Sequence, residues 1–409
     1  MGGVTPPDPQ PVTARGVPPP VAYLDHAATS PLRPEVAEAV APFAAGRFGN
    51  ASGSHRVARD ARRALEEARE EVAERLGCGP SEVVFTSGGT ESDNLAVQGV
   101  LWAATDGGPV PPSVVCSAVE HAAVLEPCRA VARAAGRHGG PPITLREAPV
   151  GHDGAIDVER LEGMLDAGVV LVSVMLANNE VGTVQPVDEV AEAVRRRAPA
   201  AAVHTDAVQA AAWLDVGRDA GSADLVSVSA HKLGGPKGSG ALVVRAGTPL
   251  NPLLYGGGQE QERRSGTHDV GAAVGLAVAL RLAAAEWETE GARVRALRDR
   301  LADGLLAAVG DTVESAPRDR VLPGHCHVRF GKVDQEELLV LLDEQGVCAS
   351  AAAACASGAV EPSHVLRAMG VPDAEARGGV RFSLGWSTSE DDVARALTVV
   401  PEAVSRLRG

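Results

Sequence analysis

Between about residue 55 and residue 280, the chain alternates short apolar runs with longer segments that mostly have helical spacing. The runs are continuously apolar, whereas a strand with one solvated face alternates apolar and polar residues. Strands that are apolar on both faces are typical of a mostly parallel sheet covered by helices. The runs are VVF (83–85), SVVCSAV (113–119), VVLVSVM (169–175), AAAVHTDA (200–207), ADLVSVSA (223–230) and ALVVR (241–245). The sequence therefore predicts an α/β fold, followed after residue 280 by a long helix and a smaller α+β region.

The composition is that of a globular protein and argues against several other classes. Of the 409 residues, 45% are hydrophobic and 22% are charged, an ordinary balance for a soluble domain. The net charge is −15, and no basic cluster suggests a face for nucleic acid. The first 20 residues hold seven prolines and no apolar stretch, so we expect a disordered arm over 1–20 and no secretory signal. No run approaches the roughly 18 consecutive apolar residues of a membrane span, and we expect a cytoplasmic protein.

The six cysteines are scattered and form no CxxC pair, which argues against a disulfide framework and against a zinc site. His325-Cys326-His327 is the one local cluster of metal-ligating types. Neighbouring residues on a strand point to opposite faces, so these three do not converge on one ion. We expect free thiols and no metal centre.

Polar residues follow five of the predicted strands at their carboxyl ends, where open α/β sheets bind ligands. The polar residues are Ser87–Ser92, Glu120 with His121, Asn178–Glu180, Asp206 with Gln209, and Ser229 with His231 and Lys232. Each cluster alone has an ordinary structural explanation. Their coincidence at one edge of one sheet instead predicts a binding site.

Four of these features have complementary chemistry. The Ser87–Thr90 turn joins a strand to a helix start and suits a phosphate, although it could equally be a plain helix cap. Asp206 would be protonated inside an apolar strand end unless a cation or donor faced it. His121 could be a structural histidine, but Lys232 is hard to explain as structure, and a buried lysine readily becomes a nucleophilic amine. Pyridoxal 5′-phosphate needs such a lysine, an anion at its ring nitrogen and a phosphate cup, so we predict this cofactor.

Motifs spread along the chain resemble the cysteine desulfurases, in the class V aminotransferase group of fold type I pyridoxal-phosphate enzymes. They are YLDHAATSP, FTSGGTESDNLA, EHAAVL, NNEVGTVQP, HTDAVQ, SAHKLGGPKGSGAL, RSGT and EPSHVLRAMG, in order from Tyr23 toward the C-terminus. The resemblance implies a large cofactor-binding domain over 33–285 with a mainly parallel seven-stranded sheet. It further implies a small α+β domain made of 21–32 with 286–409, and a homodimer.

The resemblance also assigns roles around the cofactor. Lys232 would attach to the cofactor aldehyde, Asp206 would pair with the ring nitrogen, and His121 would stack on the ring and shuttle protons. The remaining cofactor contacts would come from Gly89, Thr90, Asn179, Gln209, Ser229 and His231, together with the partner subunit's Thr267. Asn179 and Arg381 would bind the carboxylate of the substrate, although a lone arginine before a strand is ordinarily a surface residue.

Cys355 is the residue that distinguishes a desulfurase from its relatives. In CASGAVEPS it lies six residues before Glu-Pro-Ser, which matches the family's catalytic cysteine. A thiolate there would take sulfur from bound L-cysteine as a persulfide, releasing alanine. The alternative is a small buried apolar residue. Two departures from the family stand out: Ala351–Ala354 replace the usual serine-glycine-serine-alanine, which predicts a stiffer loop, and Ala51 replaces a common proline.

The leading hypothesis is therefore a cysteine desulfurase that supplies sulfur to an acceptor protein. One alternative is a related class V enzyme, such as a selenocysteine lyase, C–S lyase or aminotransferase, in which the thiol is incidental. A non-catalytic sulfur-relay scaffold is a third. Iron–sulfur cluster assembly, tRNA thiolation and other biosynthetic routes all use this kind of enzyme, and the sequence leaves the acceptor open.

Overall fold

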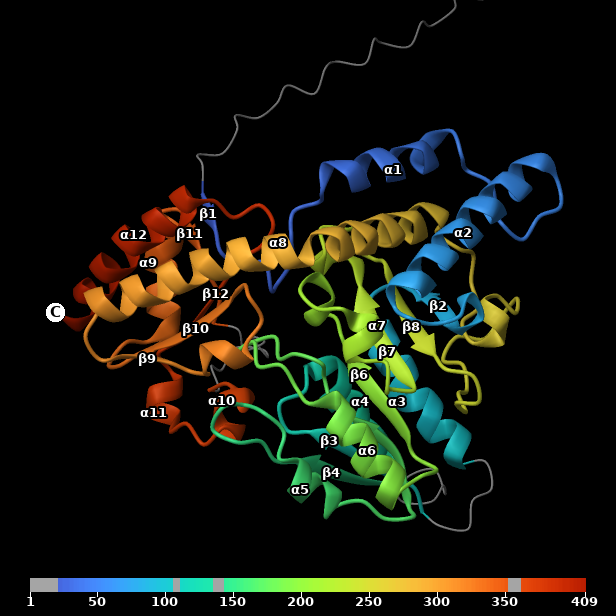
Figure 1. Ribbon diagram of the computed structural model, residues 1–409, viewed down its shortest axis with the longest axis horizontal. Coiled ribbons are helices and arrows are strands. Elements are labelled where there is room, and N and C mark those ends of the chain that lie inside the picture. Colours follow the sequence, from blue (N-terminus) through green and yellow to red (C-terminus); the bar gives the residue numbers. More distant parts are fainter. Residues whose placement is uncertain (1–20, 106–110, 135–142, 352–361) are drawn as a thin grey trace, which may run out of the picture.

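A computed structural model of the chain describes residues 21–105, 111–134, 143–351 and 362–409. Its centre is a seven-stranded sheet with the order β2-β8-β7-β6-β5-β3-β4 (Figure 1). All neighbouring strands pair in parallel except β8, which is antiparallel to both β2 and β7. The strands are β2 (Val83–Thr86), β3 (Ser113–Ser117), β4 (Thr144–Ala148), β5 (Val169–Ser173), β6 (Ala202–Asp206), β7 (Leu225–Ser229) and β8 (Gly240–Val244). The predicted mainly parallel, seven-stranded sheet is confirmed.

Strand β4 is the member of this sheet that matches none of the apolar runs. Its sequence TLREA is largely exposed, and only its last residue, Ala148, is fully buried. The strand lies at the edge of the sheet and pairs only with β3. An edge strand need not be apolar on both faces, which is why the search for continuous apolar runs missed it.

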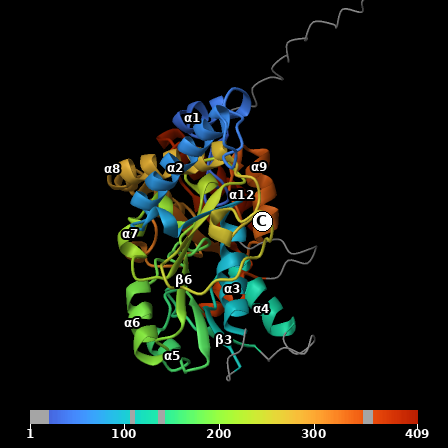
Figure 2. The same ribbon diagram turned by 90° about the vertical axis from the view of Figure 1, so that its right-hand side faces the viewer.

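Helices cover both faces of the sheet, as Figure 2 shows with α3 and α4 on one side and α6 on the other. Beneath α3 and α4, Leu95 and Leu125 pack with strand residues such as Leu171. On the opposite face, α2, α6 and α8 contribute residues such as Leu65 and Leu276 to a second core. The helices of this part are α1 (Pro34–Ala45), α2 (Arg56–Arg75), α3 (Gly89–Thr105), α4 (Ala122–Ala134), α5 (Val158–Glu162), α6 (Val187–Arg197) and α7 (Val216–Asp219).

A smaller α+β unit follows, with its own core around Leu301, Phe330 and Phe382. Its antiparallel sheet has the order β12-β10-β9, and the N-terminal strand β1 pairs in parallel with β11. The elements are β1 (Ala22–Tyr23), β9 (Thr312–Glu314), β10 (His325–Phe330), α9 (Gln335–Glu344), β11 (Val347–Cys348), α10 (His364–Ala368), α11 (Asp373–Ala376), β12 (Gly379–Ser383) and α12 (Glu390–Arg408). On β10, Cys326 faces the core while His325 and His327 share the opposite face.

Helix α8 (Val270–Ala308) runs through both units (Figure 1). Leu276 lies in the core of the large unit and Leu301 in that of the small one, so α8 crosses the predicted boundary at residue 285 without a break. Those predicted domain limits stay a prediction. Of the described helices, α8 is the one long and apolar enough to cross a membrane by length and composition, but half of its most apolar window is buried. We interpret α8 as a core helix.

Candidate active site

The carboxyl ends of β3, β6 and β7 bring three of the predicted catalytic and cofactor-binding residues together. His121 follows β3, Asp206 ends β6, and Lys232 ends a short 3-10 turn (Ala230–Lys232) after β7. Electrostatic interactions couple all three, because Asp206 acts on the pKa of both His121 and Lys232. The chain thus assembles an acid, an imidazole and an amine at one edge of the sheet.

Lys232 is half-buried, and its ammonium is held by the N-terminal segment. Its Nζ donates hydrogen bonds to the backbone carbonyls of Ala27 and Ala28, the latter at 2.9 Å. Burial lowers the pKa of Lys232 to about 8; nearby Arg381 contributes, while Asp206 opposes the change. With that pKa, about one molecule in ten carries a neutral, nucleophilic amine at pH 7.

Asp206 is 5% exposed, and its Oδ1 accepts the backbone N–H of Val208 at 2.8 Å. Burial raises its pKa, and the cationic forms of His121 and Lys232 counteract that rise. A carboxylate in such a place is stabilised by a further positive group. A protonated pyridine nitrogen would be one.

His121 has a defined tautomer because its Nδ1 accepts the backbone N–H of Ala123 at 3.1 Å. The proton of the neutral ring therefore lies on Nε2. Desolvation by the surrounding protein lowers the pKa of His121, and Lys232 adds to that effect while Asp206 opposes it. At neutral pH the imidazole is uncharged and can accept a proton.

The candidate phosphate cradle is the turn where β2 enters α3. Gly88 has a φ of +141°, which only glycine adopts readily, and its Cα lies against Gly240. A Cβ at Gly89 would stand only 2.7 Å from Val208 and 3.6 Å from Ser229, so glycine allows this turn to pack closely against both residues. Thr90 is exposed in the first turn of α3, whose free N–H groups favour an anion.

Ser229 and His231 approach this cradle from β7. The Ser229 hydroxyl makes only a long contact of 3.5 Å with the Ser239 carbonyl, and His231 Nδ1 lies 3.1 Å from the Thr29 hydroxyl. Gln209, near the end of β6, donates from Nε2 to the Ala27 carbonyl at 2.8 Å. A helix N-terminus with two hydroxyls and an imidazole fits a phosphate ester, and Lys232 with Asp206 fits its pyridine aldehyde.

Arg381 links the small unit to this site. It lies inside β12, not before a strand, and it is 4% exposed rather than on the surface. Its guanidinium donates to Asp25 Oδ1 at 2.7 Å and to the Asn179 carbonyl at 2.8 Å, while its buried Nε has no hydrogen-bond partner among the described residues. An unsatisfied nitrogen here suits a substrate carboxylate, the role predicted for Arg381 and Asn179.

Two predicted site residues are not placed with the others. Thr267 is exposed and lines a separate hollow with Phe43 and Phe48, which none of the other predicted site residues lines. That position is compatible with a role in a partner subunit's site. Cys355 lies outside the described residues, as do Ala352–Ala354, so the predicted loop stiffness stays a prediction. Cys348 is half-buried on β11.

The described residues on either side of Cys355 are tied to the site. Before it, the backbone of Ser350 exchanges hydrogen bonds with Arg381, at 2.8 and 3.1 Å. After it, Ser363 donates to the buried Glu180 carboxyl at 2.5 Å, and His364 Nε2 lies 3.0 Å from the carbonyl of Glu120, the neighbour of His121. Described residues on both sides of 352–361 are therefore anchored beside the substrate-binding and catalytic residues.

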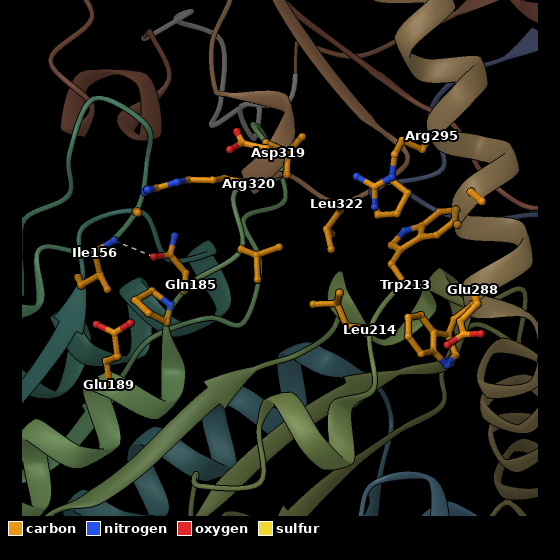
Figure 3. A pocket seen from close by; sticks show the side chains of 18 of the residues that line it. Ile156, Gln185, Glu189, Trp213, Leu214, Glu288, Arg295, Asp319, Arg320 and Leu322 are labelled. Atoms are coloured by element: carbon orange, nitrogen blue, oxygen red, sulfur yellow. Dashed lines mark hydrogen bonds between the residues drawn. The ribbon is translucent and has the colours of Figure 1, made fainter.

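A large cavity of the described structure lies elsewhere. It measures about 1110 Å³ and is lined by residues such as Gln185, Trp213, Arg295 and Leu322 (Figure 3). None of the predicted site residues lines it. Lys232 lines a neighbouring, much smaller hollow that shares Trp213 with the large one. Cavity size is therefore a poor guide to the chemistry in this molecule.

Sequence reasoning missed several groups of the site. Asp25 and the carbonyls of Ala27 and Ala28 reach Arg381, Gln209 and Lys232 across more than 180 residues of chain. These residues belong to the YLDHAATSP motif, which resembles the family but by itself assigned no role to this segment. The buried acids Asp93 and Glu120 were also not assigned, although each is close in sequence to a predicted site residue.

Comparisons with known proteins agree with this geometry. A family model described as aminotransferase class V matches residues 22–396. The chain is 45% identical over 392 residues to an IscS-like cysteine desulfurase of Mycobacterium tuberculosis, covering 95% of this chain and 97% of that protein. A solved NifS-like protein superposes with a TM-score of 0.86 at 34% identity, covering 94% of this chain and 100% of the other. A structure of SspA in complex with cysteine superposes with a TM-score of 0.75 at 32% identity, covering 88% and 98%.

Proposed function

Because this chain belongs to the class V aminotransferase family and is a pyridoxal-phosphate-dependent cysteine desulfurase, we propose that Lys232, His121 and Cys355 carry out its chemistry. The observation that carries this assignment is the coupling of Lys232, Asp206 and His121 at the strand ends. Arg381, brought in from the small unit, completes the arrangement.

The residues that would hold the cofactor are those whose geometry fits it. Asp206 would face the ring nitrogen and Gln209 the ring hydroxyl. The phosphate would be held by Gly89, Thr90, Ser229 and His231, with the partner subunit's Thr267. When bound, pyridoxal phosphate supplies a carbonyl for amines and a ring that draws electrons from the substrate's Cα.

Each of the chain's own groups then has a defined task. The Lys232 amine, made available by its lowered pKa, attaches the cofactor and can afterwards move a proton at the substrate's Cα. The neutral imidazole of His121 accepts and returns protons nearby. Arg381, with Asn179, orients the substrate through its carboxylate.

The Cys355 thiolate takes the sulfur. A new S–S bond forms between this thiolate and the substrate sulfur as the substrate's Cβ–S bond breaks. The electron pair of the broken bond stays on the carbon side, which takes up protons and leaves as alanine. Ser350 lies five residues before Cys355, and its backbone is hydrogen-bonded to that of Arg381. Because five extended residues span at most about 17 Å, the chain is long enough for the thiol to reach a substrate bound at Arg381.

We further propose that the persulfide passes to an acceptor protein, that the enzyme is a homodimer, and that it works in the cytoplasm. The exposed Thr267 supports the dimer, since it lies away from the other cofactor contacts of its own chain. The free state of the cysteines in the described residues supports a reducing compartment. Iron–sulfur cluster assembly and tRNA thiolation are both uses that fit a protein acceptor.

The test compares the wild type with Cys355→Ala, using Cys348→Ala as the matched control. After incubation with L-cysteine, mass spectrometry of the wild type and the control should show one added sulfur on the peptide that contains Cys355, together with alanine. The Cys355→Ala variant should form neither while keeping the visible absorbance of the bound cofactor. Alanine formation at the wild-type rate by Cys355→Ala would instead point to a related lyase in which the thiol is incidental.

A further inference from the structure

Three carboxyl groups are buried together behind the proposed active site. Asp93 on α3 is 1% exposed, Glu120 after β3 is 0% exposed, and Asp206 at the end of β6 is 5% exposed. The charge of Asp206 raises the proton affinity of Asp93, and both acids raise that of Glu120. Buried acids this close cannot all be ionised, because each charge would lie in a poorly polarisable interior beside another like charge.

Only one of the three acids has a cationic group to stabilise its charge. Asp206 faces the Lys232 ammonium, which lowers the pKa of Asp206. Glu120 accepts the Met175 N–H at 2.6 Å through Oε1, and its Oε2 is unpartnered within the described residues. The only basic side chain within ion-pair distance of Asp93, in the described part of the chain, is His204, whose Nε2 lies 3.6 Å from Asp93 Oδ1.

His204 does not supply the missing positive charge. Its ring is fully buried, and burial lowers its pKa to about 3. Its Nδ1 lies 2.8 Å from the Ser173 hydroxyl and its Nε2 lies 3.0 Å from the Ser227 hydroxyl. Both nitrogens are therefore satisfied by neutral partners. The 3.6 Å contact with Asp93 is therefore not an ion pair.

The side chains form a polar row under the sheet edge, with Ser173 on β5, His204 on β6 and Ser227 on β7. The row ends beside Asp93, whose Oδ1 lies 3.6 Å from His204 Nε2 and has no hydrogen-bond partner among the described residues. An ionised Asp93 would be a buried carboxylate with one unpartnered oxygen and no cationic partner in the described part of the chain, and burial without such partners strongly disfavours the charge.

We propose that Asp93 is held as a neutral carboxylic acid, so that the single negative charge of this buried acid cluster stays on Asp206. This inference rests on the proposed function, in which Asp206 pairs with the cofactor's ring nitrogen. Asp93 is thus a positioning residue, which acts on the cofactor only through the charge state of Asp206. His204 and the two serines bond to one another and leave Asp93 without a charged partner.

The direct test is infrared spectroscopy of the cofactor-free protein, with aspartate isotopically labelled at its side-chain carboxyl carbon. At neutral pH, the wild type should show a label-sensitive carbonyl band of a protonated acid. Asp93 and Asp206 are the only buried aspartates in the described residues, so two variants identify the band. The carbonyl band should persist in Asp206→Asn and in the exposed control Asp188→Asn. In Asp93→Asn, the part of the band that comes from Asp93 should vanish.

A wild type without such a band would overturn the proposal, as would a band that is lost in Asp206→Asn. These outcomes need no folded Asp93→Asn protein, and they do not depend on cofactor binding. Failure of the proposed function would instead appear as a protein that takes up no cofactor, while the infrared band still reports the state of Asp93.

A second readout uses the loaded enzyme. Asp93→Asn replaces a neutral acid by a neutral amide, so no charge is lost. The pH midpoint of the cofactor's visible absorbance reports the apparent proton affinity of the bound cofactor, and the variant should change that affinity by no more than about twofold. If Asp93 were ionised, removing its charge beside Asp206 would change that affinity by about tenfold or more. A shift of that size would contradict the neutral assignment.

Discussion

The guanidinium of Arg381 is held from two sides, by the Asp25 carboxylate and by the backbone carbonyl of Asn179. Asp25 belongs to the N-terminal segment, Asn179 to a loop of the large unit, and Arg381 to the small unit. One buried side chain thus fixes the relative placement of three segments beside Lys232. Its planar fork makes both hydrogen bonds and leaves Nε without a partner among the described residues.

We predict that Arg381→Lys weakens substrate binding without removing the cofactor. An ammonium cannot reach both present partners and also bind a carboxylate in two-point fashion. The KM for L-cysteine should rise by about tenfold or more, equivalent to about 1.4 kcal/mol, with unchanged cofactor absorbance. Steady-state kinetics would measure this, with the exposed Arg377→Lys as the control. An unchanged KM would show that Arg381 does not bind the substrate.

At the residue scale, the sequence was sufficient for groups whose chemistry is unusual for their position. Lys232 and Asp206 follow apolar strands, where a charged group needs a reason, and both were predicted. Asp25 and Asp93 were not, for a physical reason. The role of Asp25 depends on its contact with Arg381, 356 residues away, which the sequence does not show. In the sequence, Asp93 resembles any polar residue in the first turns of a helix, and only the folded structure shows that it is buried.

Among the secondary-structure elements, the segment between β8 and α8 contains the most strained backbone. Glu260, Gln261 and Glu262 all have positive φ, at 48°, 58° and 66°, in the region that favours glycine. Buried contacts hold this conformation. Arg69 of α2 donates to both carboxylate oxygens of Glu260 at 2.7 and 2.8 Å, and His268 Nε2 lies 2.7 Å from Oε1.

We predict that Glu260→Gln destabilises the fold, and more so at neutral pH than in acid. Burial opposes ionisation, but the hydrogen bonds from Arg69 and His268 outweigh it and lower the pKa of Glu260 to about 2. A lowered carboxyl pKa stabilises the folded state above the unfolded-state value of about 4.5, and this stabilisation disappears as the pH falls toward about 2. At neutral pH, the free energy of unfolding of Glu260→Gln should be about 3 kcal/mol lower than that of the wild type.

Urea unfolding at several pH values would measure this effect. The difference in free energy of unfolding between the wild type and Glu260→Gln should shrink between about pH 4.5 and pH 2. The exposed neighbour gives the control, Glu262→Gln, which should change stability little at any pH. A pH-independent difference between wild type and Glu260→Gln would contradict the role of the Arg69 pair.

The elements predicted from sequence are those whose burial pattern is uniform. Continuous apolar runs identified the six inner or well-covered strands, and the long helix after residue 280 is present as α8, although it already begins at Val270. Strand β4 escaped because an exposed edge has no such pattern. The left-handed run at Glu260 could not be foreseen either, since its sequence contains no glycine and its conformation depends on Arg69, 191 residues away.

At the scale of the whole molecule, the arrangement of the two units explains why the site is built as it is. The large unit supplies Lys232, Asp206 and His121 from rigid strand ends, while the small unit supplies Arg381 and the flanking anchors of the Cys355 segment. The sequence predicted the sheet and its ligand edge, because hydrophobic periodicity and strand-end chemistry are local. Contacts between the units are long-range, and a single sequence does not encode them as a pattern.

The account depends on one covalent link between the Lys232 amine and pyridoxal phosphate. Cofactor-free protein should be incubated with pyridoxal phosphate, reduced with borohydride and digested, and the modified peptide should be located by mass spectrometry. The wild type and the exposed control Lys237→Ala should become coloured and carry the trapped cofactor on Lys232, whereas Lys232→Ala should carry none there. A wild type that stays colourless, or that carries the cofactor on another lysine, would contradict the account.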